Sequence, residues 1–214
     1  LKQIRFQNNL IETLEAWDIQ LVKYGSEVIK YREKFIKHLG EVCQKIHNKL
    51  TGGKEKILLE YDRDVGYDSY LTELAKKRQK DLKYSTTTVG PHRDDISFIV
   101  NGIDIRKYGS QGQQRSIVLA LKLAEADILY RKTGERPVIL LDDVMSELDM
   151  SRRDYLLNHL DGRQVFITCC DPETVRLMET GRGFYVEKGT VRQDTDEKAG
   201  EVHAENETPT CESE

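Results

Sequence analysis

Residues 108–149 read YGSQGQQRSIVLALKLAEADILYRKTGERPVILLDDVMSELD. This stretch contains a loop of mostly small residues at the start of a predicted helix and, after the helix, a predicted strand that ends in an acidic pair. The apolar run from Val138 to Leu141 is typical of a strand covered on both faces. Asp142 and Asp143 follow where such a strand leaves its sheet. Open α/β sheets bind ligands at that carboxyl edge. The stretch therefore predicts an α/β fold with a ligand site at the end of this strand.

A helix from about Gln113 to Lys132 is predicted between these two features. Its apolar residues lie nearly all around the helix, which predicts a buried central helix; they are Ile117, Val118, Leu119, Leu121, Leu123, Ala124, Ile128 and Leu129. The segment from Ser110 to Gly112 leaves free backbone N–H groups at the positive end of the helix dipole. Such an end is suited to an anion, most often a phosphate.

Three segments resemble motifs of the ATP-binding-cassette (ABC) ATPases, and their order and spacing agree. GSQGQ (109–113) resembles the signature loop, ILLDD (139–143) the Walker B strand, and SELD (146–149) the D-loop. GSQGQQR (109–115) and GPHRDD (90–95) further resemble the bacterial RecF recombination mediators, and the likeness extends to about Thr190. The resemblance implies the C-terminal part of an ABC-type P-loop NTPase head, with mostly parallel core strands, a buried helix and a helical lobe.

The resemblance also implies a nucleotide site shared between two subunits. The signature loop and the D-loop are expected to meet ATP bound by the opposite subunit through Ser110, Gln111, Gly112, Gln113 and Asp149. ATP would then join two copies of the chain, and hydrolysis would release them. Asp149 is equally well placed to be the N-cap of a helix from Ser151 to Leu160.

The acidic pair carries the expected catalytic chemistry. Asp142 is expected to hold Mg²⁺ through its water shell, because Mg²⁺ keeps several waters and uses few carboxylates. Asp143 falls where the superfamily usually has the glutamate that orients or deprotonates the attacking water. Its side chain is one methylene shorter, which predicts slow ATP turnover because the placement of the water is sensitive at the 1 Å level. The resemblance implies that DNA stimulates this turnover in the complete protein.

Two parts of an ABC ATPase are missing from the sequence. Nothing matches the phosphate-binding GxxxxGK[ST] loop, and the nearest string, TGGK (51–54), is typical of a turn. The chain starts with leucine in mid-pattern, so we expect a fragment without the P-loop that is inactive alone. Residues 169–171 (CCD) follow a predicted strand, Gln164–Thr168, where many ABC ATPases have a phosphate-sensing histidine.

Residues 1–50 are predicted to be helical. Apolar residues recur there at steps of three and four: Leu10, Leu14, Trp17, Leu21, Tyr24, Val28, Tyr31, Phe35, Leu39, Val42, Ile46 and Leu50. Gly25 and Gly40 each cost about 1 kcal/mol in a helix interior, which favours two or three helices over one rod. The stripe either packs a local bundle or forms an arm that meets a partner or DNA.

The net charge of −4 means that any DNA contact must come from a local basic patch. One candidate is the end of a helix predicted from Ser69 to Leu82, with the cations Lys76, Lys77, Arg78, Lys80 and Lys83. These cations either follow a phosphate backbone or form a solvated face. Arg93 either pairs with Asp94 or Asp95 or faces the nucleotide or DNA side of the head.

The remaining patterns predict local structure and domains. Ile96, Phe98 and Val100 alternate before Asn101-Gly102, and Ile103 and Ile105 follow, which predicts a two-residue β-hairpin. A strand at 56–61 and a closing hairpin at 184–191 are also expected. We predict a helical lobe (1–83), the head part (84–193) and an acidic disordered tail (194–214).

The function implied by the resemblance is DNA repair, recombination and replication, including the SOS response. The complete protein is expected to bind ATP and Mg²⁺, to form an ATP-dependent homodimer and to engage duplex DNA or single-strand/double-strand junctions. With mediator partners, it would help to load a recombinase at single-strand gaps. A cytoplasmic protein without a membrane partner is expected, because no segment has about 20 apolar residues in a row. The alternatives are a chromosome-organising head of the SMC or RecN type and the nucleotide-binding subunit of a transporter.

Overall fold

The computed structural model describes residues 1, 12–160, 162–171, 174 and 177–193, in two compact units, Leu1–Arg136 and Pro137–Glu214. This division differs from the predicted boundary at residue 83. Strand β1 (Ile57–Asp62) pairs with β2 (Asp95–Val100), so segments from both sides of residue 83 share one sheet. The predicted tail, 194–214, lies outside the described residues.

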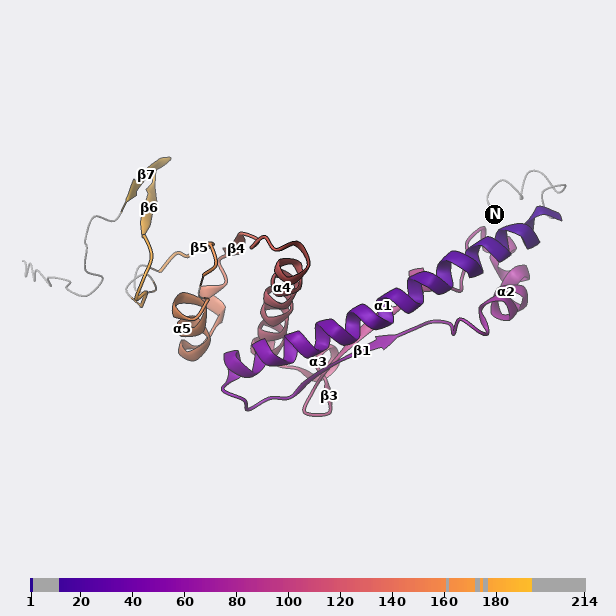
Figure 1. Ribbon diagram of the computed structural model, residues 1–214, viewed down its shortest axis with the longest axis horizontal. Coiled ribbons are helices and arrows are strands. Elements are labelled where there is room, and N and C mark those ends of the chain that lie inside the picture. The colour runs from indigo at the N-terminus through magenta and orange to yellow at the C-terminus, as the bar shows by residue number, and fades with distance from the viewer. Residues whose placement is uncertain (2–11, 161, 172–173, 175–176, 194–214) are drawn as a thin grey trace, which may run out of the picture. The chain divides into compact units, whose positions relative to one another are not determined.

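The first unit is built on one long helix, α1 (Leu14–Thr51), so the prediction of two or three helices is wrong. Gly25 allows a close approach, because a Cβ there would lie 2.6 Å from Cε1 of Tyr70. A Cβ at Gly40 would lie 3.5 Å from Cβ of Leu59, an ordinary van der Waals distance. Packing along the helix therefore outweighs the two propensity costs. Figure 1 shows β1 running alongside α1.

The predicted apolar stripe is buried at Leu14 and again toward the end of α1, where Leu39, Val42, Ile46 and Leu50 are buried. The stripe residues between these two parts are exposed by 40% or more: Trp17, Leu21, Tyr24, Val28, Tyr31 and Phe35. In the N-terminal half of α1 a different face of the helix is buried. Ile29 on that face packs in a small hydrophobic core, the second core, with Val65, Tyr70, Leu74 and Val89.

The predicted hairpin is confirmed. β2 pairs with β3 (Ile103–Asp104), and the turn residues Asn101 and Gly102 both have positive φ, 50° and 83°. The returning strand is shorter than predicted, because Ile105 is buried and starts the short helix α3 (Ile105–Tyr108). The order in the antiparallel sheet is β1-β2-β3.

Two further α-helices, α2 (Tyr70–Tyr84) and α4 (Gln111–Thr133), belong to the first unit. α2 follows Ser69, as predicted, although the Ser69 side chain does not cap it. α4 packs beside the C-terminal half of α1 (Figure 1). Ile117, Ala120 and Leu123 are buried against this packing, whereas Val118 and Leu129 are more than half exposed. Burial of α4 all around is therefore not observed among the described residues.

The second unit contains the predicted parallel pair, β4 (Ile139–Asp142) and β5 (Val165–Thr168). Between them lie a short 3-10 turn, η3 (Met145–Glu147), and α5 (Met150–Asn158). The closing hairpin, β6 (Phe184–Glu187) with β7 (Thr190–Gln193), follows. The α/β class is confirmed. Leu140 is 75% exposed, so within the described residues β4 is covered on one face only.

Candidate functional site

The signature-like loop forms a regular helix start. Ser110 is the N-cap of α4, and its Oγ accepts a hydrogen bond from the Gln113 backbone N–H at 3.2 Å. In return, the Gln113 Oε1 accepts from the Ser110 backbone N–H at 3.1 Å, which completes a capping box. Gly109 fits closely over α3, because a Cβ there would lie 2.6 Å from the Ile105 carbonyl oxygen.

The open side of this helix start is suited to an anion. Ser110 and Gln111 are exposed, and a Cβ at Gly112 would meet nothing within 4 Å. The first backbone N–H groups of an α-helix have no partner within the helix, and the helix dipole adds positive potential there. The structure thus brings Ser110, Gln111, Gly112 and Gln113 together at one helix end, and their contact with ATP stays a prediction.

The acidic strand end is organised by a threonine from the neighbouring strand. Parallel register places Asp142 opposite Thr168, whose hydroxyl donates to Asp142 Oδ1 at 2.5 Å. The same hydroxyl oxygen accepts from the Asp143 backbone N–H at 3.0 Å. Both aspartates are exposed, and Asp143 has φ 49°, an uncommon value for a residue with a side chain. Thr168 therefore orients the predicted metal ligand.

The sequence motifs gave Thr168 no role in orienting Asp142. One signal for such a role was available in the sequence. Parallel strands that run in register bring their last residues side by side, so Thr168 at the end of one strand could have been placed next to Asp142 at the end of the other. Among the described residues, no group of three or more His, Cys, Asp or Glu side chains is arranged to hold a metal. A single aspartate suits Mg²⁺ only with water and phosphate oxygens as its other ligands.

A pocket in the second unit is lined by Asp143, Ser146 and Arg153, which follow β4 in the chain, and by Cys169 and Asp171, which follow β5. Partial burial, with the nearby Asp171 carboxylate, raises the pKa of the Cys169 thiol. The protonated thiol is a poor nucleophile and metal ligand. The pocket thus offers polar groups beside Asp143.

Asp149, in the segment that resembles a D-loop, is a helix N-cap, as one of the two predictions for it stated. Asp149 is the N-cap of α5, and its Oδ1 accepts from the Arg152 backbone N–H at 3.0 Å. The Arg152 guanidinium also pairs with the same carboxylate. Arg153 donates from Nε to the Leu148 carbonyl at 2.9 Å, which holds the loop against the start of α5. A role of Asp149 at a subunit contact stays a prediction.

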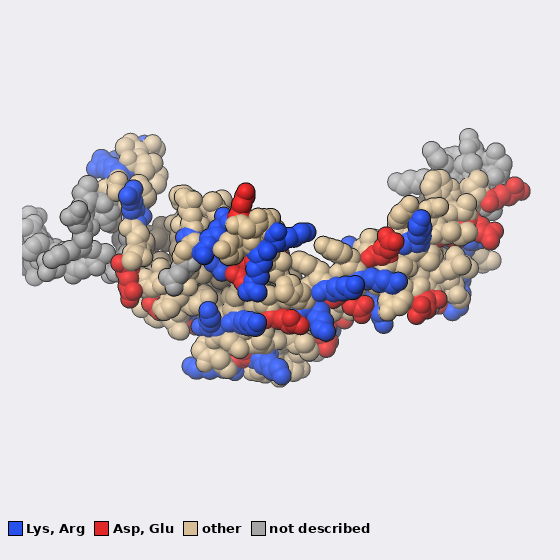
Figure 2. Space-filling model, viewed as in Figure 1, with Lys and Arg blue, Asp and Glu red and all other residues tan. Residues whose placement is uncertain are grey.

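The predicted basic residues differ in their availability. Lys76 pairs with Glu73 at 2.6 Å, and Arg78 pairs with the buried Asp18 of α1. Lys77 and Lys80 are exposed on α2. On the face drawn in Figure 2, Lys and Arg side chains lie interspersed with Asp and Glu side chains. Binding of DNA by α2 stays a prediction.

Pairing of Arg93 with Asp94 or Asp95, one of the two hypotheses above, is wrong. Asp94 accepts from the Tyr61 hydroxyl and lies 3.4 Å from the Arg32 guanidinium, while Asp95 pairs with Arg106 at 2.5 Å. Burial and the Asp94 carboxylate raise the pKa of Tyr61 to about 12. Asp94 therefore ties α1 to β1, and Arg93 is exposed.

Comparison with known proteins identifies close relatives. No protein-family model matches the chain. A DNA replication and repair protein RecF of Agathobacter rectalis is 48% identical over 193 residues, which is 89% of this chain and 53% of the relative. RecF of Lachnoclostridium phytofermentans is 44% identical over 90% of this chain and 54% of its own length. The chain thus spans about half the length of the curated relatives it matches.

Two solved structures are also similar to this chain. Both are of the recombination mediator protein RecF in the RecFOR pathway. The RecF-ATPrS structure has a TM-score of 0.71 and 35% identity, covering 90% of this chain and 53% of the solved one. The RecF-ATP structure has the same TM-score and 37% identity, covering 85% of this chain and 50% of the solved one.

Proposed function

Because this chain belongs to the RecF family and corresponds to a C-terminal portion of its members, we propose that it supplies two parts of an ATP site to a DNA repair and recombination protein. The first is the signature-like start of α4, which contacts ATP held by a second subunit. The second is the acidic end of β4, which acts on ATP held by its own subunit. Identity above 40% to RecF proteins favours this function over the chromosome-organising and transporter alternatives.

The observation that carries the proposal is the preorganised helix start. The Ser110 hydroxyl accepts from the Gln113 N–H at 3.2 Å and donates to Gln113 Oε1 at 3.3 Å. Because a hydroxyl hydrogen rotates, it can turn from this long bond to an acceptor of a ligand. A γ-phosphate oxygen is an acceptor of the required kind, and the dipole of α4 favours its charge. An ATP-dependent homodimer follows if the phosphate is bound by the opposite subunit.

At the acidic end, Asp142 would hold Mg²⁺ through water, and Thr168 keeps its carboxylate in one orientation. Mg²⁺ would neutralise charge on the phosphate oxygens during phosphoryl transfer. Asp143 would orient or deprotonate the attacking water. Its short side chain suits slow turnover, which DNA would stimulate.

DNA and protein partners are the least direct part of the proposal. Lys77, Lys80 and Arg93 are exposed cations within the first unit and suit contact with the phosphates of duplex DNA or of a single-strand/double-strand junction. Help in loading a recombinase, with other mediators, rests on family membership. Within the part of the chain that the structure describes, no helix is both long and apolar enough to cross a bilayer. A cytoplasmic setting stays a prediction.

Ser110→Arg in the full-length protein tests the proposal. The larger, cationic side chain would fill the open helix start, so ATP-driven dimerisation measured by light scattering should be lost while the monomer stays folded. Thr72→Arg, which adds the same charge on the exposed face of α2, is the matched control. A dimer fraction that Ser110→Arg leaves unchanged at saturating ATP would refute contact in trans.

A further inference from the structure

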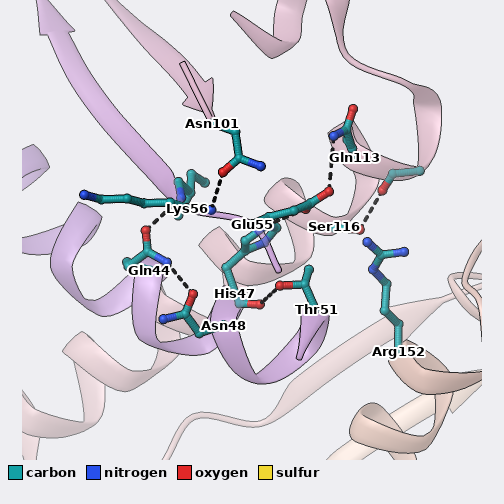
Figure 3. Close-up of polar contacts among 12 residues, drawn as sticks. Gln44, His47, Asn48, Thr51, Glu55, Lys56, Asn101, Gln113, Ser116 and Arg152 are labelled. Atoms are coloured by element: carbon teal, nitrogen blue, oxygen red, sulfur yellow. Dashed lines mark hydrogen bonds and ion pairs between the residues drawn. The ribbon is translucent and has the colours of Figure 1, made fainter. Parts of the chain in front are cut away.

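Glu55 lies outside every motif considered so far, yet it contacts the signature-like helix start directly. It follows the turn that ends α1, and β1 begins two residues later. Its Oε1 accepts from the Gln113 Nε2 at 3.1 Å, and its Oε2 lies 3.0 Å from the His47 Nε2. Figure 3 shows Glu55 between the two side chains. His47 is fully buried, and the Glu55 side chain is 17% exposed.

The carboxylate decides which way the Gln113 amide points. An ionised carboxylate only accepts hydrogen bonds, so Gln113 must turn its NH₂ group toward Glu55. The amide oxygen then faces Ser110, where it accepts from the backbone N–H at 3.1 Å and from the side-chain hydroxyl at 3.3 Å. With the amide reversed, its oxygen would face the Glu55 carboxylate, so that two acceptors would meet. Its NH₂ group would face the Ser110 backbone N–H, so that two donors would meet. Glu55 therefore selects the orientation that closes the capping box.

Glu55 itself is held in place from both sides. The next two backbone N–H groups are bound, that of Lys56 by Asn101 Oδ1 at 2.9 Å and that of Ile57 by Gln44 Oε1 at 2.7 Å. These contacts fix the segment to the hairpin turn and to α1 (Figure 3). The His47 ring holds the second carboxylate oxygen from the buried side. The carboxylate thus has a defined position when it meets Gln113.

We propose that Glu55, supported by His47, is a positioning residue for the signature loop. It acts through Gln113 to hold the Ser110 hydroxyl and backbone in the geometry that meets a phosphate in trans. This inference rests on the proposed function, because it assigns to Glu55 an effect on the contact that Ser110 is proposed to make. Since His47 belongs to α1, the contact also ties the end of the long helix to the nucleotide-facing end of α4.

Glu55→Ala in the full-length protein tests this role. It removes the acceptor for the Gln113 amide in both copies, so the ATP-dependent dimer should dissociate at least about tenfold more readily, the loss expected for one hydrogen bond to a charged group. The affinity of the monomer for ATP should stay within about twofold of the unmodified protein, because Glu55 acts only on the contact in trans. Glu60→Ala, which removes an exposed carboxylate from β1, is the matched control.

A double-mutant cycle separates positioning from a general effect on folding. If Glu55 acts through Gln113, Glu55→Ala should add little to the loss caused by Gln113→Ala, whereas independent effects add. Glu55→Gln keeps an acceptor for the Gln113 amide and should stay near the unmodified dimer affinity. Additive losses, or a dimer affinity that Glu55→Ala leaves unchanged, would overturn the role of Glu55.

Two further comparisons keep the test decisive. If Ser110→Arg abolishes the dimer and Glu55→Ala does not, the role of Glu55 is wrong and the proposed function stands. If neither variant changes the dimer, the role of Glu55 and the proposed contact in trans are both refuted. Should Glu55→Ala fail to fold, Gln113→Glu replaces it by setting two carboxylates against each other. Adding Glu55→Gln to that variant restores one amide–carboxylate pair and should restore the dimer; continued loss would refute the pairing.

Discussion

Gly25→Ala and Gly40→Ala make the same chemical change at two places in α1, and we expect opposite effects on stability. Each removes a helix-interior glycine, which alone gains about 1 kcal/mol. At Gly40 the new Cβ would lie 3.5 Å from Cβ of Leu59, an ordinary van der Waals contact. Gly40→Ala should therefore raise the free energy of unfolding by somewhat less than about 1 kcal/mol.

At Gly25 the new methyl group would overlap the Tyr70 side chain, which is buried and has no free space to move into. The new Cβ would lie 2.6 Å from Cε1 and 3.2 Å from the hydroxyl oxygen of Tyr70, which is 2% exposed and belongs to the second core. Overpacking of this kind costs about 1–3 kcal/mol, more than the gain in helix propensity. Gly25→Ala should lower the free energy of unfolding by about 1 kcal/mol, so the two variants should differ by about 2 kcal/mol.

Urea unfolding followed by far-UV circular dichroism measures both variants, because the three longest helices, α1, α2 and α4, all belong to the first unit. In a Tyr70→Leu background the obstruction is gone, so Gly25→Ala should become stabilising by up to about 1 kcal/mol. Equal stabilisation by Gly25→Ala and Gly40→Ala with Tyr70 present would refute the account of why α1 is a single helix.

Two further predictions concern the acidic strand end and a buried thiol. Asp142→Asn in the full-length protein should lower ATP hydrolysis at least about 100-fold, measured as phosphate release, with ATP binding largely kept; persistent turnover would refute the metal assignment. Burial raises the pKa of Cys43 from 9.0 to about 12. The unfolded thiol then loses its proton first, so this contribution to stability is complete below pH 9 and is lost as the pH rises toward 12. Between pH 9 and 12 the free energy of unfolding should therefore decrease less steeply with pH in Cys43→Ala than in the unmodified protein, by up to about 1.4 kcal/mol per pH unit. The same slope in both proteins would contradict this prediction.

Local patterns in the sequence were sufficient for much of the fold. Asn101-Gly102 predicted the hairpin because its two residues tolerate positive φ, and the structure has both. Asp149 was recognised as an N-cap because short polar side chains bond the first backbone N–H groups of a helix. The strands β4 and β5 and the helix after Ser110 followed from their apolar runs, while the parallel arrangement of the strands was implied by the resemblance to ABC ATPases. Each of these signals lies within a few consecutive residues, where backbone preference and hydrophobic period act.

Contacts between distant residues were decided only by the tertiary structure. Gly25 and Gly40 were read as helix breaks, since nothing nearby in the sequence shows that Tyr70 and Leu59 pack against them. Glu55 and Gln113 are 58 positions apart, and no motif joins them. A side chain acquires such a partner only when packing brings two segments together, and that packing is a property of the whole unit. The sequence by itself therefore determined the elements and the motifs, while the folded chain decided which residues hold them in place.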